Sequence, residues 1–307
     1  MNYTLAKALP PGSTIGVVAP SSTIGDYKVE PNVAILESMG YKVKLGKSAQ
    51  ASWGYLAGDD ALRAADLQAA FLDDEIDGIV CLRGGYGATR ILPFLNYEAI
   101  AAHPKVFVGF SDITALHTMF LQRCHMATIH GPMVMSLQKA SDYTKEYLAR
   151  GLADPFAAGP VLLPPEGRLE TIVPGDVTGT LCGGNLMLLA VTEGTPYSLD
   201  IENMILLIEE TSEPVYSLDR LLCQLEQSGL IRRAKGIIFG EFTRCEPVEP
   251  APYEFTVQDI IYQYARKWGK PAICGFPAGH GADNLWLPLG RPVRLHCTDT
   301  AADVEIL

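Results

Sequence analysis

The sequence predicts an α/β protein of two domains, each built on a sheet with packed helices. In the first half, short apolar runs typical of buried strands alternate with segments of helical periodicity. Such alternation favours a largely parallel sheet flanked by helices. Residues 156–172 are rich in proline and glycine and show no clear period. We interpret them as a linker between an N-terminal domain, residues 1–155, and a C-terminal α/β domain, residues 173–307.

Each element of the N-terminal domain follows from a local pattern. Apolar runs that stop at glycine, proline or polar residues predict strands, and apolar residues at helical spacing predict helices. The expected strands cover 14–19, 41–46, 77–85 and 105–110, and the expected helices cover 29–39, 59–72 and 112–124.

The same patterns resume after the linker. We expect a helix that starts near Asn185 and a second helix over 217–231 that closes around Gly229. The expected strands cover 204–210, 234–242 and 271–281, and the last residues, 291–307, are expected to form a hairpin.

Composition narrows the class of protein. Hydrophobic residues make up 48% of the 307 residues and charged residues 19%, which is enough apolar material for a sizeable core. The formal net charge of −11 would repel a phosphate backbone, so nucleic acid is not an expected partner. Seven scattered cysteines without a C-x-x-C pair favour buried thiols in a reducing compartment over disulfides or a zinc site.

The chain also lacks the patterns of membrane and metal proteins. The N-terminus has no continuous apolar segment of the signal-peptide kind, and no run approaches the roughly 20 apolar residues of a membrane span. No H-E-x-x-H or comparable spacing predicts a metal site. We therefore expect a cytoplasmic protein with no metal, no cofactor and no membrane contact.

Candidate catalytic residues are expected where strands end, because sites in open α/β sheets form at the carboxyl ends of strands. Ser111 lies between the expected strand 105–110 and the expected helix 112–124. A serine there sits at a helix N-terminus, where the backbone N–H of Asp112 can stabilise an oxyanion. The G-x-S-x-G spelling is absent, and a helix-capping role is the competing interpretation.

A second strand end carries glycines. The sequence LRGGYG at 82–87 runs from an apolar strand into Gly84 and Gly85. Glycines permit a sharp turn and close approach to a ligand, and their N–H groups can act as donors to a developing anion. A phosphate-binding loop and a plain tight turn are the alternatives, and the dinucleotide-binding and Walker spellings are missing.

Two further strand ends supply an acid and a base. Glu209 ends an apolar strand, and His280 lies in the glycine-flanked loop AGHGADN. A serine hydroxyl needs a base, neutral histidine has a suitable pKa, and a carboxylate can orient the histidine. His117 is expected inside a helix, whereas His130 follows a short apolar stretch and is a candidate to line the site.

These segments resemble the LD-carboxypeptidase family of serine peptidases, which includes muramoyltetrapeptide carboxypeptidases and microcin C immunity hydrolases. The similar stretches run in order along nearly the whole chain. They are IGVVAPSS (15–22), GYLAGDDALRAADLQAAFLDDEIDGIVCLRGGYGATRIL (54–92), VGFSDITALH (108–117), GTLCGGNL (179–186), LLIEETSEPVYSLDRLL (206–222) and FPAGHGADNLWLPLG (276–290).

The resemblance implies a role for each candidate. It implies an active site in the cleft between the two domains, with Ser111 as nucleophile, His280 as general base and Glu209 as the orienting acid. The oxyanion hole would be the backbone N–H groups of Asp112 and Gly85. Glu210 stands where the family pattern suggests an aspartate, which leaves open which of the two carboxylates orients the histidine.

The implied reaction is acyl transfer from the amide that joins an L-centre, lysine or meso-diaminopimelate, to a C-terminal D-alanine. Arg83 and Tyr86 are the expected substrate-binding residues, with Arg83 a candidate to hold the terminal carboxylate. The resemblance also suggests a homodimer. The alternatives are a microcin immunity-type hydrolase of aminoacyl nucleotide analogues, which would need an aromatic surface, and a non-catalytic muropeptide-binding protein.

Overall fold

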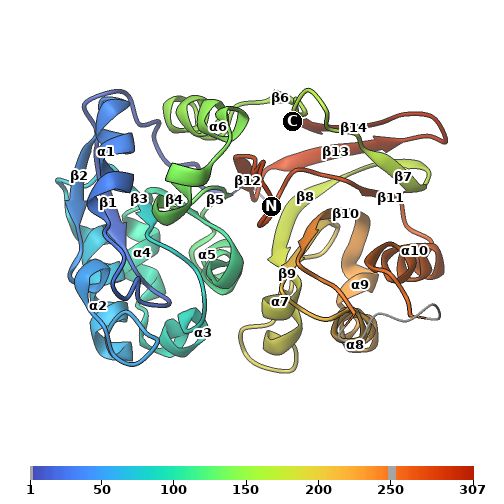
Figure 1. The fold of residues 1–307 in the computed structure, drawn as a ribbon, viewed down its shortest axis with the longest axis horizontal. Helices are drawn as coiled ribbons and strands as arrows, with labels where there is room; N and C mark the ends of the chain where they lie inside the picture. Colours follow the sequence, from blue (N-terminus) through green and yellow to red (C-terminus); the bar gives the residue numbers. More distant parts are fainter. Residues whose placement is uncertain (1–2, 248–253) are drawn as a thin grey trace. The chain divides into compact units, whose positions relative to one another are not determined.

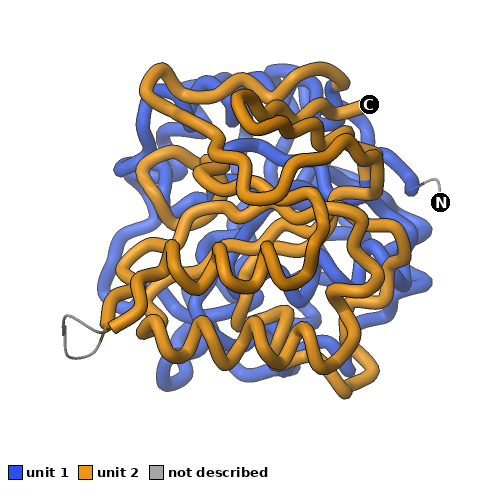
Figure 2. Tube along the Cα trace, turned by 90° about the vertical axis from the view of Figure 1, so that its right-hand side faces the viewer, with its two compact units in different colours: residues 1–157, 285–290 blue, residues 158–284, 291–307 orange. Residues whose placement is uncertain are grey.

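The computed structural model describes residues 3–247 and 254–307. The chain divides into two compact units (Figure 2). Unit 1 comprises residues 1–157 and 285–290, and unit 2 comprises residues 158–284 and 291–307. Both units are α/β, which confirms the predicted fold class.

Unit 1 is built on a six-stranded sheet with the order β12-β5-β4-β3-β1-β2 (Figure 1). Its five N-terminal strands are parallel, and β12 pairs antiparallel with β5. The strands are β1 (Thr14–Val18), β2 (Lys42–Leu45), β3 (Gly78–Cys81), β4 (Val106–Gly109), β5 (Thr128–His130) and β12 (Leu287–Leu289). The helices are α1 (Glu30–Ser38), α2 (Asp60–Leu72), α3 (Ala88–Ile91), α4 (Tyr97–Ala102), α5 (Thr114–Cys124) and α6 (Asp142–Ala153).

Alternation along β4 explains why helices cover both faces of this sheet. Val106 and Val108 belong to a buried cluster that includes side chains of α1 and α6. Phe107 points to the opposite face, where its ring lies 5.9 Å from that of Phe71 on α2 and 4.9 Å from that of Phe120 on α5. Successive strand residues point to opposite faces, so this fully apolar strand needs a helix layer on each side.

Unit 2 is built on an eight-stranded mixed sheet with the order β6-β14-β13-β8-β9-β10-β11-β7. Strands β8 to β11 are parallel, and the outer pairings are antiparallel. The strands are β6 (Gly159–Pro160), β7 (Glu170–Val173), β8 (Gly175–Asn185), β9 (Met204–Thr211), β10 (Ala234–Thr243), β11 (Ala272–Cys274), β13 (Pro292–Cys297) and β14 (Ala302–Ile306). The helices are α7 (Leu186–Thr192), α8 (Val215–Ser228), α9 (Leu230–Arg233) and α10 (Val257–Trp268).

Local chemistry sets where the two longer helices of unit 2 begin and end. Thr256 and Asp259 form a capping box at the start of α10, in which each side chain satisfies a backbone N–H of the other. Gly229 ends α8 at φ 91°, a backbone conformation that glycine adopts without steric cost. The two helices are joined by the Tyr264 hydroxyl, which donates to Asp219 Oδ1 over 2.7 Å.

The sequence-based boundaries differ from this division in two places. The stretch expected to be a linker, 156–172, contributes β6 and most of β7 to the sheet of unit 2. Residues 285–290 lie in unit 1, where Trp286 is buried and donates from Nε1 to Pro155 O over 3.0 Å. The strand expected over 271–281 is only three residues long and leaves a long loop that contains His280. The closing hairpin is confirmed by the pairing of β13 with β14.

Candidate active site

Ser111 follows β4 in a strained backbone conformation. Its φ is 64°, in the left-handed region that non-glycine residues rarely adopt, and it opens a short 3-10 turn that leads into α5. The sequence of elements is therefore strand, sharp turn and helix, as in a nucleophile elbow, although the G-x-S-x-G spelling is absent. Backbone strain at this partly buried serine suggests a functional constraint there.

The glycine turn at 84–87 packs directly against Ser111. A Cβ added to Gly84 would lie 2.9 Å from Ser111 Cβ and 3.1 Å from its Oγ. The same position is 3.4 Å from the backbone nitrogen of Asp112. Gly85 adopts φ 118°, and a Cβ there would overlap Ser22 Oγ. The turn thus brings backbone, without any side chain, to the serine hydroxyl.

The side chain of Asp112 holds the serine and the glycine turn in place through buried hydrogen bonds. Its buried carboxylate accepts from Ser21 Oγ at 2.5 Å and from the backbone N–H of Ala88 at 2.8 Å. Burial raises the pKa of Asp112, and the two hydrogen bonds act in the opposite direction. Asp112 therefore joins the ends of β1 and β4 to the start of α3, and its backbone N–H is held next to Gly84 and Ser111.

His117 supports the same strand end from the interior. It is fully buried on α5, and its Nε2 lies 2.8 Å from Gly109 O. Burial lowers the pKa of His117 to about 4, so its neutral ring donates from Nε2 to that carbonyl. His130 is also fully buried, with its ring 5.8 Å from that of Phe110.

Arg83 and Tyr86 have different environments although both belong to the glycine turn. Arg83 donates from Nη1 to Thr23 O over 3.1 Å and from Nε to Gly84 O over 3.2 Å, so part of its guanidinium holds loops together. Tyr86 is tied by its backbone N–H to Ser22 Oγ, and its ring is 49% exposed. Of the two, Tyr86 presents the more accessible side chain.

Unit 2 brings Glu209 and His280 together. Glu209, on β9, is fully buried, and its Oε2 lies 2.8 Å from His280 Nδ1. A carboxylate can only accept, so Nδ1 carries the proton of the neutral imidazole and Nε2 carries the lone pair. This is the arrangement in which a carboxylate orients a histidine base.

Glu210 points away from His280. Its Oε1 accepts from Asn185 Nδ2 at 2.9 Å and from the backbone N–H of Thr211, and its Oε2 accepts from the backbone N–H of Met187 at 2.8 Å. Burial raises the pKa of Glu210 to about 7, against the effect of these donors. Its contacts tie β9 to the start of α7, so the carboxylate that contacts the histidine is Glu209.

A carboxylate that the sequence analysis missed lies on the other side of His280. A Cβ added to Gly281 would overlap the carboxyl group of Glu241, which therefore fills the side-chain space of that glycine. Burial raises the pKa of Glu241 to about 7, and the charges of Asp283 and Glu209 add to the effect. In the sequence, Glu241 is marked only by its position at the end of an apolar strand, GIIFGE. Glu209 has a comparable position at the end of another strand.

Both halves of the chain match models of known domains. Residues 15–131 match the LD-carboxypeptidase N-terminal domain, and residues 178–295 match the LD-carboxypeptidase C-terminal domain. The chain belongs to the LD-carboxypeptidase family. Ser111 and the glycine turn lie in the N-terminal match, and Glu209, Glu241 and His280 lie in the C-terminal match.

Similar proteins span the whole length of this LD-carboxypeptidase. A probable murein peptide carboxypeptidase from Bacillus subtilis is 37% identical over 99% of this chain and 95% of its own. The murein tetrapeptide carboxypeptidase of Pseudomonas aeruginosa is 34% identical over 93% of this chain and 94% of its own. The family and these relatives make the protein a serine peptidase of the LD-carboxypeptidase type.

Solved structures show the same fold. The muramoyltetrapeptide carboxypeptidase from Oxalobacter formigenes superposes with a TM-score of 0.84 at 26% identity, covering 96% of this chain and 98% of its own. An MccF-like protein from Bacillus anthracis superposes with a TM-score of 0.88 at 25% identity, covering 99% of both chains.

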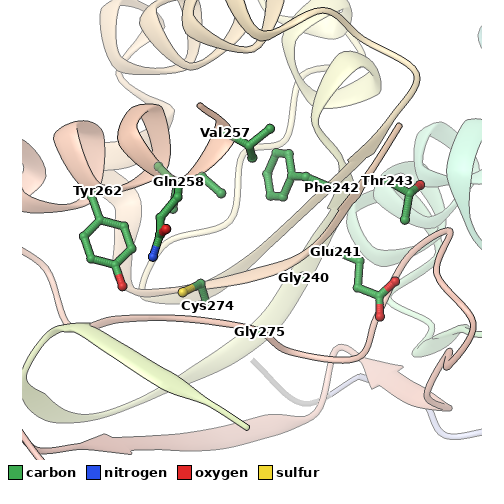
Figure 3. Close-up of a pocket in the computed structure, with 10 residues that line it drawn as sticks. Gly240, Glu241, Phe242, Thr243, Val257, Gln258, Tyr262, Cys274 and Gly275 are labelled. Atoms are coloured by element: carbon green, nitrogen blue, oxygen red, sulfur yellow. The ribbon is translucent and has the colours of Figure 1, made fainter. Parts of the chain in front are cut away.

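Unit 2 also contains a cavity of about 440 Å³ between β10, β11 and α10. Figure 3 shows Tyr262, Gln258 and Cys274 together at one end, whereas the carboxylate of Glu241 points away from them. No Lys or Arg is among the described residues that line it. Within the described residues, no group of three or more His, Cys, Asp or Glu side chains could hold a metal ion.

Among the helices of residues 3–247 and 254–307, none has the length and apolar character needed to cross a bilayer. All seven cysteines are free, and burial raises the pKa of Cys124 to about 12. A buried thiol with a raised pKa is a poor nucleophile.

Proposed function

We propose that this LD-carboxypeptidase releases the C-terminal D-alanine of murein tetrapeptides by hydrolysing the amide that joins it to an L-centre. The observation that carries the proposal is the buried Glu209–His280 hydrogen bond, because it prepares a histidine to act as a base. The strained serine of unit 1 supplies the matching nucleophile. The substrate class is supported by the murein peptide and murein tetrapeptide carboxypeptidases that the chain resembles over its full length.

In the proposed mechanism, His280 Nε2 takes the proton of Ser111 Oγ as the hydroxyl attacks the scissile carbonyl. The negative charge of Glu209 stabilises the imidazolium that forms. His280 then gives its proton to the leaving nitrogen, and D-alanine departs with a free amine. Water, deprotonated by His280, attacks the Ser111 ester and releases the shortened peptide, and the proton returns to the serine.

The tetrahedral intermediate places a negative charge on the former carbonyl oxygen. We propose the backbone N–H groups of Asp112 and Gly85 as its donors. The close packing of Gly84 against Ser111 and Asp112 supports a backbone origin for these donors, since no side chain fits between the turn and the serine.

The proposal requires the serine of unit 1 and the histidine of unit 2 to act on the same carbonyl. Its test is incubation of L-Ala-D-Glu-mDAP-D-Ala with wild type and with Ser111→Ala, followed by mass spectrometry. We expect loss of one alanine with wild type only. Absence of cleavage by both proteins would reject this substrate, and equal cleavage by both would reject Ser111 as nucleophile.

One observation favours a second candidate, hydrolysis of aminoacyl nucleotide analogues. Tyr86 of the glycine turn is an exposed aromatic side chain, as are Trp53 and Tyr55 in the loop before α2. The rings of Tyr55 and Tyr86 lie 5.8 Å apart, and the Arg90 guanidinium lies 5.8 Å from the ring of Trp53. Such a surface can stack on a nucleobase. Release of the amino acid from a glutamyl sulfamoyl adenosine would establish this activity, and its absence would dismiss it.

We also propose that the enzyme works in the cytoplasm. All seven thiols are free, and five of them are buried, which suits a reducing compartment. Fractionation of the source cells, with immunodetection of the protein, tests this directly; recovery in a membrane or extracellular fraction would contradict it.

A further inference from the structure

An irregularity in β10 lies directly opposite Glu209. Ile208 of β9 pairs with Phe239 of β10, and Glu210 pairs with Phe242. Two residues of β10, Gly240 and Glu241, therefore oppose the single residue Glu209. Such a bulge changes the direction of the side chain that follows it and is common next to active sites.

The bulge brings the carboxylate of Glu241 to the loop that carries His280. The backbone N–H of Glu241 donates to Ala278 O over 2.9 Å, which fastens β10 to this loop. Gly279 and Gly281 flank the histidine, and each faces a carboxylate. A Cβ at Gly279 would lie 2.8 Å from Glu209 Oε2, and one at Gly281 would overlap Glu241. The two glycines thus admit two carboxylates, one on each side of His280.

These two carboxylates differ in their contacts. Glu209 is paired with His280, whereas the side chain of Glu241 has no hydrogen bond or ion pair within residues 3–247 and 254–307. Its charged neighbours are Glu209, Asp283 and His280. A half-buried carboxylate among like charges is unfavourable unless a cation compensates it. Among the described residues, no Lys or Arg pairs with Glu241, and His280 is hydrogen-bonded to Glu209, so the carboxyl is either protonated or compensated by a cation of a ligand.

We infer that Glu241 binds the cationic side chain of the substrate residue that supplies the scissile carbonyl. The inference rests on the proposed function, in which the acyl group is transferred to Ser111 with the help of His280. The side chain of the acyl residue must then lie close to that histidine. A primary ammonium, as in lysine or diaminopimelate, matches the charge of Glu241 and can donate to both of its oxygens. Glu241 is thus the specificity-determining residue for this substrate position.

The test compares two tetrapeptides that differ only at the third residue, L-lysine in one and L-norleucine in the other. Norleucine keeps the aliphatic chain and lacks the ammonium group. We expect wild type to prefer the lysine peptide in kcat/KM by about ten- to one-hundredfold, the range for a hydrogen bond to a charged group. If wild type cleaves both peptides equally well, the inference is overturned while the proposed function stands.

Substitution of the carboxylate provides the second arm. In Glu241→Gln, the ratio of kcat/KM for the lysine peptide to kcat/KM for the norleucine peptide is expected to come close to one. The change should come chiefly from slower cleavage of the lysine peptide. Glu305→Gln, a half-buried carboxylate on β14, is the matched control and should keep the wild-type ratio. An unchanged ratio in Glu241→Gln would contradict the inference. If wild type cleaves neither tetrapeptide, the proposed function itself is rejected.

A third arm uses pH and needs no substitution. The preference for lysine should fall as the pH is lowered through about 7, because Glu241 then becomes protonated. His280, Glu209 and Asp283 are the charged groups that face Glu241, and they are the same in both reactions. A ratio that stays constant between about pH 6 and pH 8 would assign the preference to a group other than Glu241.

Discussion

The strand ends of the two units give the proposed catalytic residues different surroundings. In unit 1, the surroundings of Ser111 are backbone: a strained φ, a glycine turn in contact, and side chains such as Asp112 turned inward to hold the loops. In unit 2, the surroundings of His280 are charged side chains, Glu209 and Glu241, that enter next to glycines. Unit 1 should therefore be sensitive to added volume, and unit 2 to changes of charge.

The largest effect is expected from the charge of Glu209. Glu209→Gln keeps the size of the side chain but removes the charge that stabilises the imidazolium, so kcat should fall by about 10² to 10⁴. The measurement is steady-state hydrolysis of the tetrapeptide.

Glu210→Gln is the matched control, because Glu210 carries the same group one residue away and its carboxylate accepts from groups of β8, α7 and its own strand rather than from His280. It should leave kcat near the wild-type value and lower the free energy of unfolding by about 1–3 kcal/mol through its lost acceptor. A large fall of kcat in Glu210→Gln with little change in Glu209→Gln would assign the orienting role to Glu210.

Added volume in the glycine turn should have the next largest effect. Gly84→Ala places a methyl group 2.9 Å from Ser111 Cβ, so the turn or the serine must move. A displacement of this kind is expected to lower kcat/KM by about 10- to 100-fold. Gly131→Ala is the control in the same unit, since its Cβ would meet neighbours only at 3.4 Å or more. Equal activity of the two variants would show that the turn does not constrain the serine.

These expectations depend on features that the sequence reveals unequally. The strand-turn-helix pattern around Ser111 is local, so it was readable from apolar runs alone. Apolar runs do not reveal which of Glu209 and Glu210 orients the histidine. Neighbouring residues of a strand point to opposite faces, and the sequence does not say which face holds the histidine. Glu241 was missed because a bulge depends on pairing between strands and leaves no local mark. The return of residues 285–290 to unit 1 was missed for the same reason, since β12 pairs with a strand more than 150 residues earlier.

A smaller effect concerns stability at Ser111. Serine at φ 64° is strained, whereas glycine adopts this conformation freely. Ser111→Gly should therefore unfold at a higher denaturant concentration than Ser111→Ala. The free energies of unfolding of these two inactive variants should differ by about 1 kcal/mol. Equal stability in chemical denaturation would mean that the turn is not held under strain.

The smallest effect is the pH dependence of stability that Glu241 contributes. Burial raises its pKa to about 7, above the ordinary value of 4.5 that applies in the unfolded chain. The folded protein therefore retains a proton where the unfolded chain has lost it, and stability falls as the pH rises from about 4.5 to about 7. Thermal unfolding at about pH 5 and pH 7.5 should show a smaller loss of Tm in Glu241→Gln than in wild type. An identical loss in both proteins would contradict the raised pKa.

In the proposed mechanism, Ser111 of unit 1 is activated by the Glu209–His280 pair of unit 2. Labelling with a fluorophosphonate, which reacts with activated serines, tests it most directly when the adduct is located by peptide mass spectrometry in wild type and in His280→Ala. We expect an adduct on Ser111 in wild type and almost none in the variant. An adduct on another residue, or equal labelling of Ser111 in both proteins, would contradict activation of Ser111 by His280.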